Sequence, residues 1–385
     1  NAYTNEAPSH KDGVSAPNYF CRRKQASELE RMALLSSAQR CALKGRITAF
    51  KPCAPVISGR SRKALAVHAV SDDAFAAYKP TVAALFPGQG AQSVGMAKDL
   101  VAEVPAAKEL FDKASEILGY DLLKLCVEGP KDKLDSTAIS QPAIYVASLA
   151  AVEKLRATEG QAAIDAIDVA AGLSLGEYTA LAFAGAMSFE DGLRLVKLRG
   201  ESMQAAADAQ PSSMVSVIGL DSAKVAELCK AATAQVGEDK PVKIANFLCT
   251  GNYAVSGSKE GCDAVEKLGK SFGARMTVRL AVAGAFHTEY MSPAVEKLRA
   301  ALAATTLVTP RIPVVSNVDA QPHSDPAAIK DILSRQVTSP VLWENTIKTL
   351  QEKGLTKSYE IGPGKVIAGI VKRMDKGANI VNITA

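Results

Sequence analysis

The sequence predicts an α/β protein in which a parallel-sheet domain is interrupted by a smaller unit of different topology. Three observations support this prediction. Strand-like and helix-like segments alternate along residues 81–383, the pattern of a parallel sheet with helices on both faces. The stretch 211–282 has instead the order strand, helix, strand, strand, helix, strand. Ahead of that stretch, a Gly-x-Ser-x-Gly sequence stands between a strand-like and a helix-like run.

The first part of the sheet domain is expected to occupy residues 81–210. Apolar residues at strand or helix spacing mark its elements. They are a strand at Thr81–Pro87, helices at about 105–118 and 141–157, a strand at Ile167–Ala171, a helix beginning at Glu177 and a helix at about 189–207. Ser188 precedes the last helix and Asp191 lies three residues later, which resembles a helix-capping sequence.

Residues 211–282 are expected to form a ferredoxin-like subdomain of βαββαβ order. Its elements are a strand at Ser213–Leu220, a helix at Ser222–Thr233, strands at Val242–Leu248 and Asn252–Ser258, a helix at Lys259–Gly273 and a strand at Ala274–Val282. The two ends of such a unit lie close together, so it can be inserted into a parent domain. We therefore predict an insertion.

The parent domain is expected to resume over residues 283–385. Its elements are a helix at about 292–304, a strand at Pro313–Asn317, helices at about 326–337 and 341–353, a strand at Ser358–Ile361, a helix at about 365–374 and a strand at 379–383. Ligands of such sheets bind beyond the carboxyl ends of the strands. The loop after Pro87 and Ser174 both follow predicted strands, so we expect the binding site there.

The positive net charge belongs to the N-terminal region alone. Residues 1–69 carry 12 Lys or Arg and 4 Asp or Glu, whereas the rest of the chain carries 33 and 36. A mildly acidic body does not favour nucleic acid as a partner. No apolar run is long enough to span a bilayer, so no membrane span is expected.

Residues 1–69 have the composition of an organelle transit peptide. No acidic residue occurs from Met32 to Ala69, and basic residues there are spread among Ser, Ala and small apolar residues. We expect a disordered extension that directs the protein to the chloroplast stroma, with the mitochondrion as the alternative. Val67-His68-Ala69 resembles a plastid processing site, which would start the mature chain near Val70. A basic tail of another purpose is the less favoured interpretation.

Cysteine usage does not indicate a metal site. The seven cysteines are scattered, with no Cys-x-x-Cys and no His/Cys cluster at metal-ligand spacing. Three of them lie within residues 1–69, and we expect the other four to be reduced and buried.

The segment Gly172-Leu173-Ser174-Leu175-Gly176 is the most informative motif in the chain. A serine at a tight strand-to-helix turn projects above the surface, and only small residues tolerate the crowding around it. The N-terminus of the following helix offers N–H groups that can stabilise an oxyanion. Ser174 is therefore the candidate nucleophile. Because so short a motif also occurs by chance, the interpretation depends on its surroundings.

A serine nucleophile needs a base. Outside residues 1–69 the chain contains two histidines, His287 and His323. His287 follows the last strand of the predicted insertion, where the chain returns to the parent sheet, whereas His323 lies in a polar loop rich in turn residues. We favour His287, with His323 as the alternative. No acidic residue that would complete a serine–histidine–acid triad is evident.

Two further segments could support acyl chemistry. The loop Pro87-Gly88-Gln89-Gly90 lacks the Gly-Lys-Ser/Thr of a phosphate-binding loop, so a backbone N–H offered to an oxyanion is the better interpretation. Arg199 and Met203 are one turn apart on a predicted helix face. Most helix arginines lie at the surface, but a half-buried guanidinium here could bind a carboxylate with two hydrogen bonds.

Together these motifs resemble the malonyl-CoA:acyl carrier protein transacylases of type II fatty-acid synthesis. The resemblance covers about residues 81–383 and rests on five ordered motifs: Phe86-Pro87-Gly88-Gln89-Gly90, Gly172-Leu173-Ser174-Leu175-Gly176-Glu177, Arg199-Gly200-x-x-Met203, Gly284-Ala285-Phe286-His287 and Gly362-Pro363-Gly364-Lys365. It implies an α/β-hydrolase-like domain with an inserted ferredoxin-like subdomain. It also implies transfer of malonyl from malonyl-CoA to the phosphopantetheine thiol of acyl carrier protein through a malonyl-serine.

The resemblance assigns roles to individual residues. It implies that Ser174 is acylated, that His287 is its general base and that Arg199 binds the malonyl carboxylate. Gln89 and the backbone N–H of Leu175 are the implied oxyanion hole.

Three more residues take roles in the same way. In this family the main-chain carbonyl of a glutamine, not an acid, orients the histidine, and Gln336 matches it; its side chain is then expected to matter little. Asn246 matches an asparagine near the acyl pocket. Phe286 precedes the histidine, as in malonyl-selective acyltransferases of polyketide synthases, where a ring would crowd a 2-methyl group.

The implied substrate is malonyl-CoA, the implied partner is acyl carrier protein, and no cofactor or metal is expected. We expect a monomer. Leu173, Leu248 and Thr250 depart from the bacterial pattern of His, Asn and Pro, and Leu173 removes any hydrogen bond that the histidine supports. None of the three departures removes a catalytic group.

Two rival functions remain. A plain serine esterase or lipase is disfavoured by Arg199 and by the predicted insertion. A non-catalytic module that binds carrier protein is disfavoured by the joint presence of Ser174, His287 and Gln336.

Overall fold

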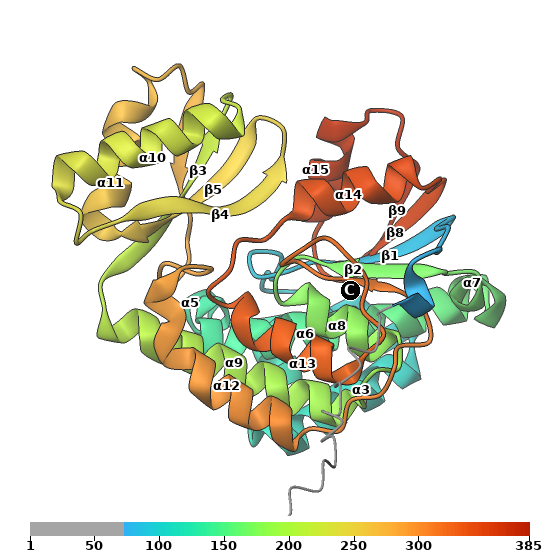
Figure 1. The fold of residues 1–385 in the computed structure, drawn as a ribbon. Coiled ribbons are helices and arrows are strands. Elements are labelled where there is room, and N and C mark those ends of the chain that lie inside the picture. The colour runs from blue at the N-terminus through green and yellow to red at the C-terminus, as the bar shows by residue number, and fades with distance from the viewer. Residues whose placement is uncertain (1–72) are drawn as a thin grey trace, which may run out of the picture. The chain divides into compact units, whose positions relative to one another are not determined.

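The computed structural model describes residues 73–385, and the predicted extension 1–69 lies outside the described residues. The described chain contains a five-stranded parallel sheet of order β7-β2-β1-β8-β9 and a four-stranded antiparallel sheet of order β4-β5-β3-β6 (Figure 1). The strands are β1 (Val82–Phe86), β2 (Val169–Gly172), β3 (Ser212–Ile218), β4 (Val242–Cys249), β5 (Asn252–Ser258), β6 (Met276–Arg279), β7 (Val314–Val315), β8 (Lys357–Ile361) and β9 (Ile380–Ile383). The predicted α/β class is confirmed.

The helices fall into three groups. Those before the antiparallel sheet are α2 (Lys98–Glu103), α3 (Pro105–Leu118), α4 (Leu122–Glu128), α5 (Lys131–Asp135), α6 (Thr137–Glu159), α7 (Gln161–Asp165), α8 (Gly176–Phe183) and α9 (Phe189–Ala209). Those within its segment are α10 (Ser222–Val236) and α11 (Lys259–Gly269). Those after it are α12 (Ser292–Ala304), α13 (Pro326–Gln336), α14 (Trp343–Glu352) and α15 (Val366–Met374).

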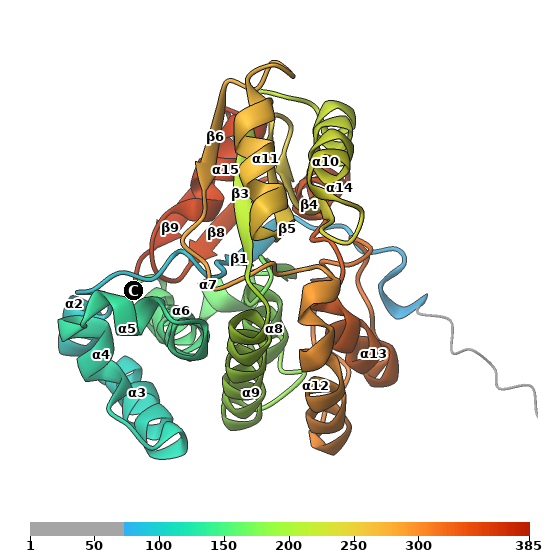
Figure 2. The same cartoon turned by 90° about the vertical axis from the view of Figure 1, so that its left-hand side faces the viewer.

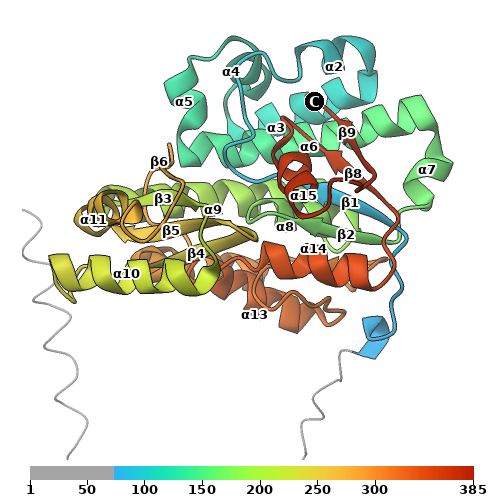
Figure 3. The same cartoon turned by 90° about the horizontal axis from the view of Figure 1, so that it is seen from above.

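The central strand β1 shows why the parallel sheet is covered on both faces. All of its side chains from Ala83 to Phe86 are fully buried, and they alternate between two separate apolar clusters. Ala84 and Phe86 join the larger cluster, with α3, α6, α8 and α9. Ala83 and Leu85 join the smaller one, with α14 and α15 (Figure 3). Consecutive residues of a strand point to opposite faces, so a continuous apolar run needs helices on both sides.

The antiparallel sheet has one covered face. Apolar side chains of β3 and β5, such as Val215, Val217 and Val255, pack against α10 and α11. Residues of the opposite face, among them Met214 and Ala254, line a cavity shared with the parallel-sheet part of the chain. In Figure 2, α9 leads directly into β3.

A second connection joins the antiparallel sheet to the rest of the chain. The edge strand β4 forms a parallel bridge to the segment between α13 and α14. The N–H of Phe247 donates to the carbonyl of Val341 at 2.9 Å, and the N–H of Val341 donates to the carbonyl of Ala245 at 2.8 Å. This bridge fixes the sheet edge beside the carboxyl ends of the parallel strands.

Element bounds differ from the predictions where packing, not local pattern, decides them. The helix expected from 141 begins at Thr137 and contains Pro142 inside its first turns. The strand expected at 313–317 pairs over only Val314–Val315, because the chain then turns into the loop that carries Asn317. The short helices α2, α4, α5 and α7 have no counterpart in the sequence analysis, since elements of five to seven residues carry little periodic signal.

Candidate active site

Ser174 lies at a sharp turn between β2 and α8, with φ of 54°. The two glycines of its motif are required by close backbone contacts. A Cβ on Gly172 would lie 1.9 Å from the carbonyl carbon of Gly176, and a Cβ on Gly176 would lie 2.1 Å from the carbonyl oxygen of Phe86. Any larger residue would therefore displace the backbone that holds the serine.

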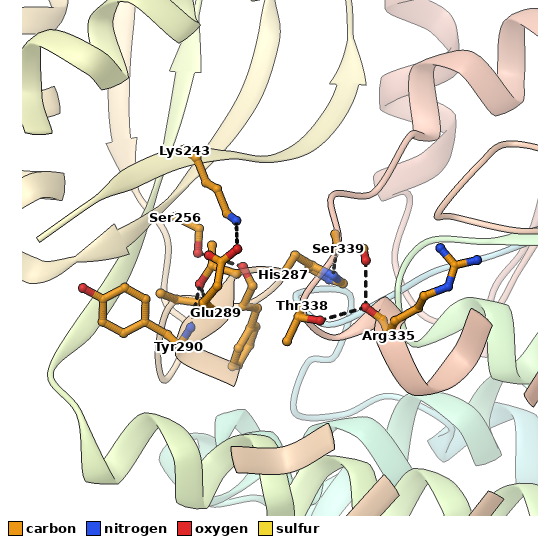
Figure 4. A network of polar contacts seen from close by, with 11 residues as sticks. Lys243, Ser256, His287, Glu289, Tyr290, Arg335, Thr338 and Ser339 are labelled. Carbon is orange, nitrogen blue, oxygen red and sulfur yellow. Dashed lines mark hydrogen bonds and ion pairs between the residues drawn. The ribbon is translucent and has the colours of Figure 1, made fainter. Parts of the chain in front are cut away.

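His287 is the histidine that reaches Ser174. Its Nε2 is 2.8 Å from the hydroxyl oxygen of Ser174. Its Nδ1 is 2.9 Å from the main-chain carbonyl oxygen of Gln336. The same nitrogen is 3.2 Å from the main-chain carbonyl oxygen of Ser339 (Figure 4). Because carbonyl oxygens only accept, Nδ1 carries the proton and Nε2 accepts from the serine hydroxyl. His323 instead pairs with Asp319 at 2.8 Å and does not line the cavity that holds Ser174.

The environment of His287 keeps its ring neutral. The side chain is 2% exposed. Burial, and secondarily the positive charge of Arg199, lower its pKa to about 4, although the bonds to the two carbonyls oppose this. A neutral imidazole with a free Nε2 lone pair can accept a proton at neutral pH.

Arg199 is fully buried, at 1% exposure, and not half-buried as the sequence suggests. Its helix α9 packs against α6 and α8. This packing places the guanidinium next to Ser174. Its Nη1 donates to the side-chain oxygen of Gln141 at 2.7 Å, and its Nη2 donates to Ser174 Oγ at 3.1 Å and to Gln336 Oε1 at 2.9 Å. The guanidinium carbon is 5.3 Å from the ring centre of Tyr178.

This guanidinium has no carboxylate at ion-pair distance among residues 73–385, although the charge of Glu177 acts on it from farther away. No carboxylate there forms an ion pair with Arg199, and its Nε has no hydrogen-bond partner. A buried cation that is paired only with neutral groups is costly, so an incoming anion would be stabilised beside it.

Ser174, His287 and Arg199 line one cavity of about 210 Å³. The other predicted site residues that line it are Gln89, Leu175, Asn246 and Phe286. Three larger hollows within residues 73–385, of about 470, 480 and 610 Å³, contain no histidine, so chemistry and not size identifies the site. Asn246 contributes a side-chain oxygen that is buried and has no hydrogen-bond partner in the described chain.

Gln89 and Leu175 each offer a backbone N–H beside the nucleophile. Neither N–H donates a hydrogen bond to any group in the part of the chain that the structure describes. Leu175 stands at the N-terminus of α8, and Gln89 lies in the loop after β1, where its side chain donates to Thr137 at 3.2 Å. Two free donors at the carboxyl ends of adjacent strands suit an oxyanion.

The sequence analysis missed Asn317, which holds the nucleophile turn. Its side-chain oxygen accepts from the N–H of Ser174 at 2.6 Å, and its side-chain nitrogen donates to the carbonyl of Gly172 at 2.7 Å. Its own N–H donates to Glu177 at 3.1 Å. The position of Asn317 just after strand β7, at the ligand-binding edge of the sheet, was the available signal.

The side chain of Gln336 makes more hydrogen bonds in the site than the sequence indicates. The main-chain carbonyl contacts His287 as the resemblance implies, but the amide group contacts three more residues. Its Nε2 donates to the carbonyl of Ser174 at 3.0 Å and to Glu177 at 2.7 Å, and its Oε1 accepts from Arg199. These contacts speak against the expectation that the side chain matters little, which a Gln336→Ala variant would test.

Known proteins resemble the chain over its described part. The acyl transferase domain family matches residues 84–382. The human mitochondrial malonyl-CoA-acyl carrier protein transacylase is 43% identical over 296 residues, 75% of each chain. The Bacillus subtilis (strain 168) malonyl CoA-acyl carrier protein transacylase is 41% identical over 304 residues, covering 79% of this chain and 93% of its own.

Solved structures agree with these matches. A malonyl CoA-acyl carrier protein transacylase from Coxiella burnetii superposes with a TM-score of 0.75 at 35% identity, covering 79% of this chain and 94% of its own. A malonyl-transacylase solved in complex with a type II polyketide acyl-carrier protein has a TM-score of 0.73 at 35% identity, covering 79% and 96%. The chain belongs to the acyl transferase domain family, among the malonyl-CoA–acyl carrier protein transacylases.

Proposed function

We propose that this acyl transferase transfers the malonyl group from malonyl-CoA to the phosphopantetheine thiol of acyl carrier protein. One observation carries the proposal beyond general acyl transfer: the unpaired guanidinium of Arg199 lies 3.1 Å from the hydroxyl oxygen of Ser174. A serine that reacts next to a buried cation favours an acyl group with a free carboxylate. The named activities of the human and Bacillus relatives support the same substrate and carrier.

The first half-reaction acylates the enzyme. The hydroxyl oxygen of Ser174 attacks the thioester carbonyl, and Nε2 of His287 takes the hydroxyl proton. The carbonyls of Gln336 and Ser339 hold Nδ1–H and stabilise the imidazolium. The C–S bond then breaks, and the CoA sulfur leaves with the proton from His287. The product is malonyl-Ser174.

The second half-reaction releases the acyl group to the carrier. The carrier thiol gives its proton to His287, and its sulfur attacks the serine ester. The ester C–O bond breaks and the proton returns to the oxygen of Ser174. In both halves the backbone N–H groups of Gln89 and Leu175 stabilise the oxyanion.

Three side chains set the acyl group that is accepted. Arg199 binds the carboxylate, and a charge-assisted hydrogen bond of this kind is worth roughly 1.5–3 kcal/mol. Phe286 narrows the cavity beside the carbon between the two carbonyl groups. The buried side-chain oxygen of Asn246 has no partner in the described chain and can accept a hydrogen bond from a donor group of the bound substrate.

We also propose that the reaction needs no metal or tightly bound cofactor and that the enzyme acts as a monomer. Ser174 and His287 account for every proton transfer in the two steps, and the two backbone donors account for the oxyanion. All of these groups come from one chain.

No group of three or more His, Cys, Asp or Glu side chains within residues 73–385 is arranged so that it could hold a metal ion. In the same residues, no helix has the length and apolar character of a membrane span.

The acid-free region from Met32 to Ala69 supports import into an organelle, and we propose the chloroplast stroma, with the mitochondrion as the alternative. Both mitochondrial and bacterial proteins are among the relatives. A fluorescent fusion of residues 32–70, expressed in a plant or algal cell with markers for both organelles, tests this. A fusion that stays in the cytosol would count against the transit interpretation.

Intact-protein mass spectrometry tests the proposed activity directly. The protein is mixed with malonyl-CoA, with and without phosphopantetheinylated carrier protein. We expect a malonyl adduct on Ser174 that disappears as the carrier gains the same mass. A plain esterase would release free malonate in preference to loading the carrier, and a binding module would form no adduct.

A further inference from the structure

Glu177, in the first turn of α8, is a buried carboxylate that the proposed mechanism does not use. It is 3% exposed, and its Oε2 accepts from the N–H of Asn317 at 3.1 Å and from Gln336 Nε2 at 2.7 Å. No ion pair to Glu177 exists within the described part of the chain. Burying a carboxylate without a cation is costly. The ionised form of Glu177 is therefore expected to rely on the hydrogen bonds that Asn317 and Gln336 donate to it.

Gln336 lies between this carboxylate and Arg199. An amide has one accepting end and one donating end. The guanidinium can only donate, and it faces Oε1 of Gln336; the ionised carboxylate can only accept, and it faces Nε2. A flipped amide would place donor against donor on one side and acceptor against acceptor on the other. Arg199 on one side, and Glu177 with the carbonyl of Ser174 on the other, therefore allow a single orientation of the amide.

We propose that Glu177 is a positioning residue that fixes the amide of Gln336 and, through it, holds the guanidinium of Arg199 ready for the malonyl carboxylate. The inference rests on the proposed function and deepens it. It assigns part of the malonyl preference to a residue that does not line the cavity. Through the N–H of Asn317, the same carboxylate also supports the turn that presents Ser174.

The charge state of Glu177 gives a second way to test the role. Burial raises its pKa to about 7; the bonds from Gln336 and Asn317 oppose the rise, Asp319 adds to it, and the positive charge of Arg199 lowers the pKa. A protonated Glu177 accepts from Nε2 of Gln336 more weakly than the carboxylate does, so the amide is held less firmly against Arg199. The malonyl preference should then weaken as the pH falls through about 7.

Three other titratable groups lie near Glu177. The guanidinium of Arg199 on α9 stays protonated. Burial raises the pKa of Tyr178 on α8 and lowers that of His287 to about 4, so neither ring titrates in that range. The pKa of Asp319, in the loop after β7, is lowered by its bond to His323 against the effect of burial. A change of His287 would also affect malonyl and acetyl loading alike, so the ratio of the two rates isolates the carboxylate-binding group.

The experiment compares malonyl and acetyl loading of Ser174 in Glu177→Gln and in the parent protein, by quenched mass spectrometry. We expect the malonyl-to-acetyl ratio to fall roughly tenfold in the variant near pH 8, about the worth of one hydrogen bond. In the parent the ratio should fall between about pH 8 and about pH 6, and in the variant it should stay flat. Glu344→Gln is the matched control, since Glu344 is also buried but is bonded to Thr250 and Lys348; its ratio should equal that of the parent.

A double-mutant comparison separates positioning from general damage. In an Arg199→Ala background, Glu177→Gln should lower the ratio no further, because the guanidinium through which it acts is gone. An unchanged ratio in a folded Glu177→Gln protein, or an equal loss with and without Arg199, overturns the proposal. If the variant does not fold, a flat ratio in the parent between pH 8 and 6 overturns it. Failure of the parent to load malonyl on Ser174 would instead refute the proposed function.

Discussion

Ser174 and His287 both have left-handed backbones, with φ of 54° and 61°, and their side chains meet at 2.8 Å. This conformation is uncommon outside glycine and persists where surrounding contacts impose it. The N–H of Ser174 is held by the Asn317 side chain, and the N–H of His287 donates to the carbonyl of Val337 at 3.0 Å. The nucleophile and its base are thus each fixed by a partner distant in sequence.

Replacement of Ser174 by Ala should abolish malonyl loading without unfolding the protein, because the hydroxyl is the group that forms the ester. Intact-mass analysis after incubation with malonyl-CoA gives the adduct, and a thermal melt checks the fold. A malonyl group mapped to another residue in this variant would exclude Ser174 as the nucleophile.

His287→Ala should lower the loading rate by roughly 10²–10⁴-fold, the usual contribution of a general base. His323→Ala is the matched control, because His323 pairs with Asp319 away from the cavity. Single-turnover rates of both variants decide between the two histidines. A greater loss in His323→Ala would reverse the assignment.

When the loading rate is measured against pH, it should begin to fall only well below pH 6.5, the ordinary pKa of histidine. Burial lowers the pKa of His287 to about 4, so the imidazole remains a competent base down to about pH 5. Acetyl-CoA is the suitable substrate for measuring kcat/KM against pH, since its loading does not need a carboxylate-binding group. An acid limb centred near 6.5 would contradict the neutral, buried histidine.

The same shift predicts a pH-dependent contribution to stability. The folded-state pKa of His287 lies below its unfolded value, so its contribution is fully present above about pH 6.5 and is lost as the pH falls toward about 4. The free energy of unfolding of His287→Gln should therefore decline less than that of the parent over this interval. Parallel curves for the two proteins would refute the assignment.

Arg199→Ala should reduce malonyl transfer by about 10²-fold or more, from a loss on the order of 3 kcal/mol. Acetyl transfer should be spared or rise, because an unpaired buried cation is removed. Arg199→Lys should rescue only partly, since an ammonium cannot form the two-pronged contact of a guanidinium. The malonyl-to-acetyl loading ratio is the measurement, and an unchanged ratio in the Ala variant would place carboxylate recognition elsewhere.

The cavity should favour malonyl over methylmalonyl, because the ring of Phe286 lines it next to His287. Loading rates from the two CoA esters test this, and Phe286→Ala should narrow the difference between them. Equal rates in the parent protein would show that the ring does not crowd a 2-methyl group.

The sequence alone determined the features that depend on local geometry. The strand-to-helix turn at Ser174 depends on Gly172 through a local contact, because a Cβ there would meet Gly176 four positions later, whereas the contact that requires Gly176 is with the distant carbonyl of Phe86. The strand Asn252–Ser258 and the helix at 292–304 have the bounds that their apolar spacing predicts. The motif order also pointed to the family, since each motif is a short run that can be read without knowing its neighbours in space.

Only the tertiary structure decided which side chains meet. His287 is 113 positions from Ser174 in the sequence. Gln336, whose amide contacts Arg199, is 137 positions from Arg199. No local pattern distinguishes a buried amide that bridges Glu177 and Arg199 from one on a helix surface, so the sequence did not indicate the contacts of this side chain. Asn317 was missed for the same reason. Hydrogen bonds between distant segments depend on how the strands and helices pack, and a short run of sequence does not specify that packing.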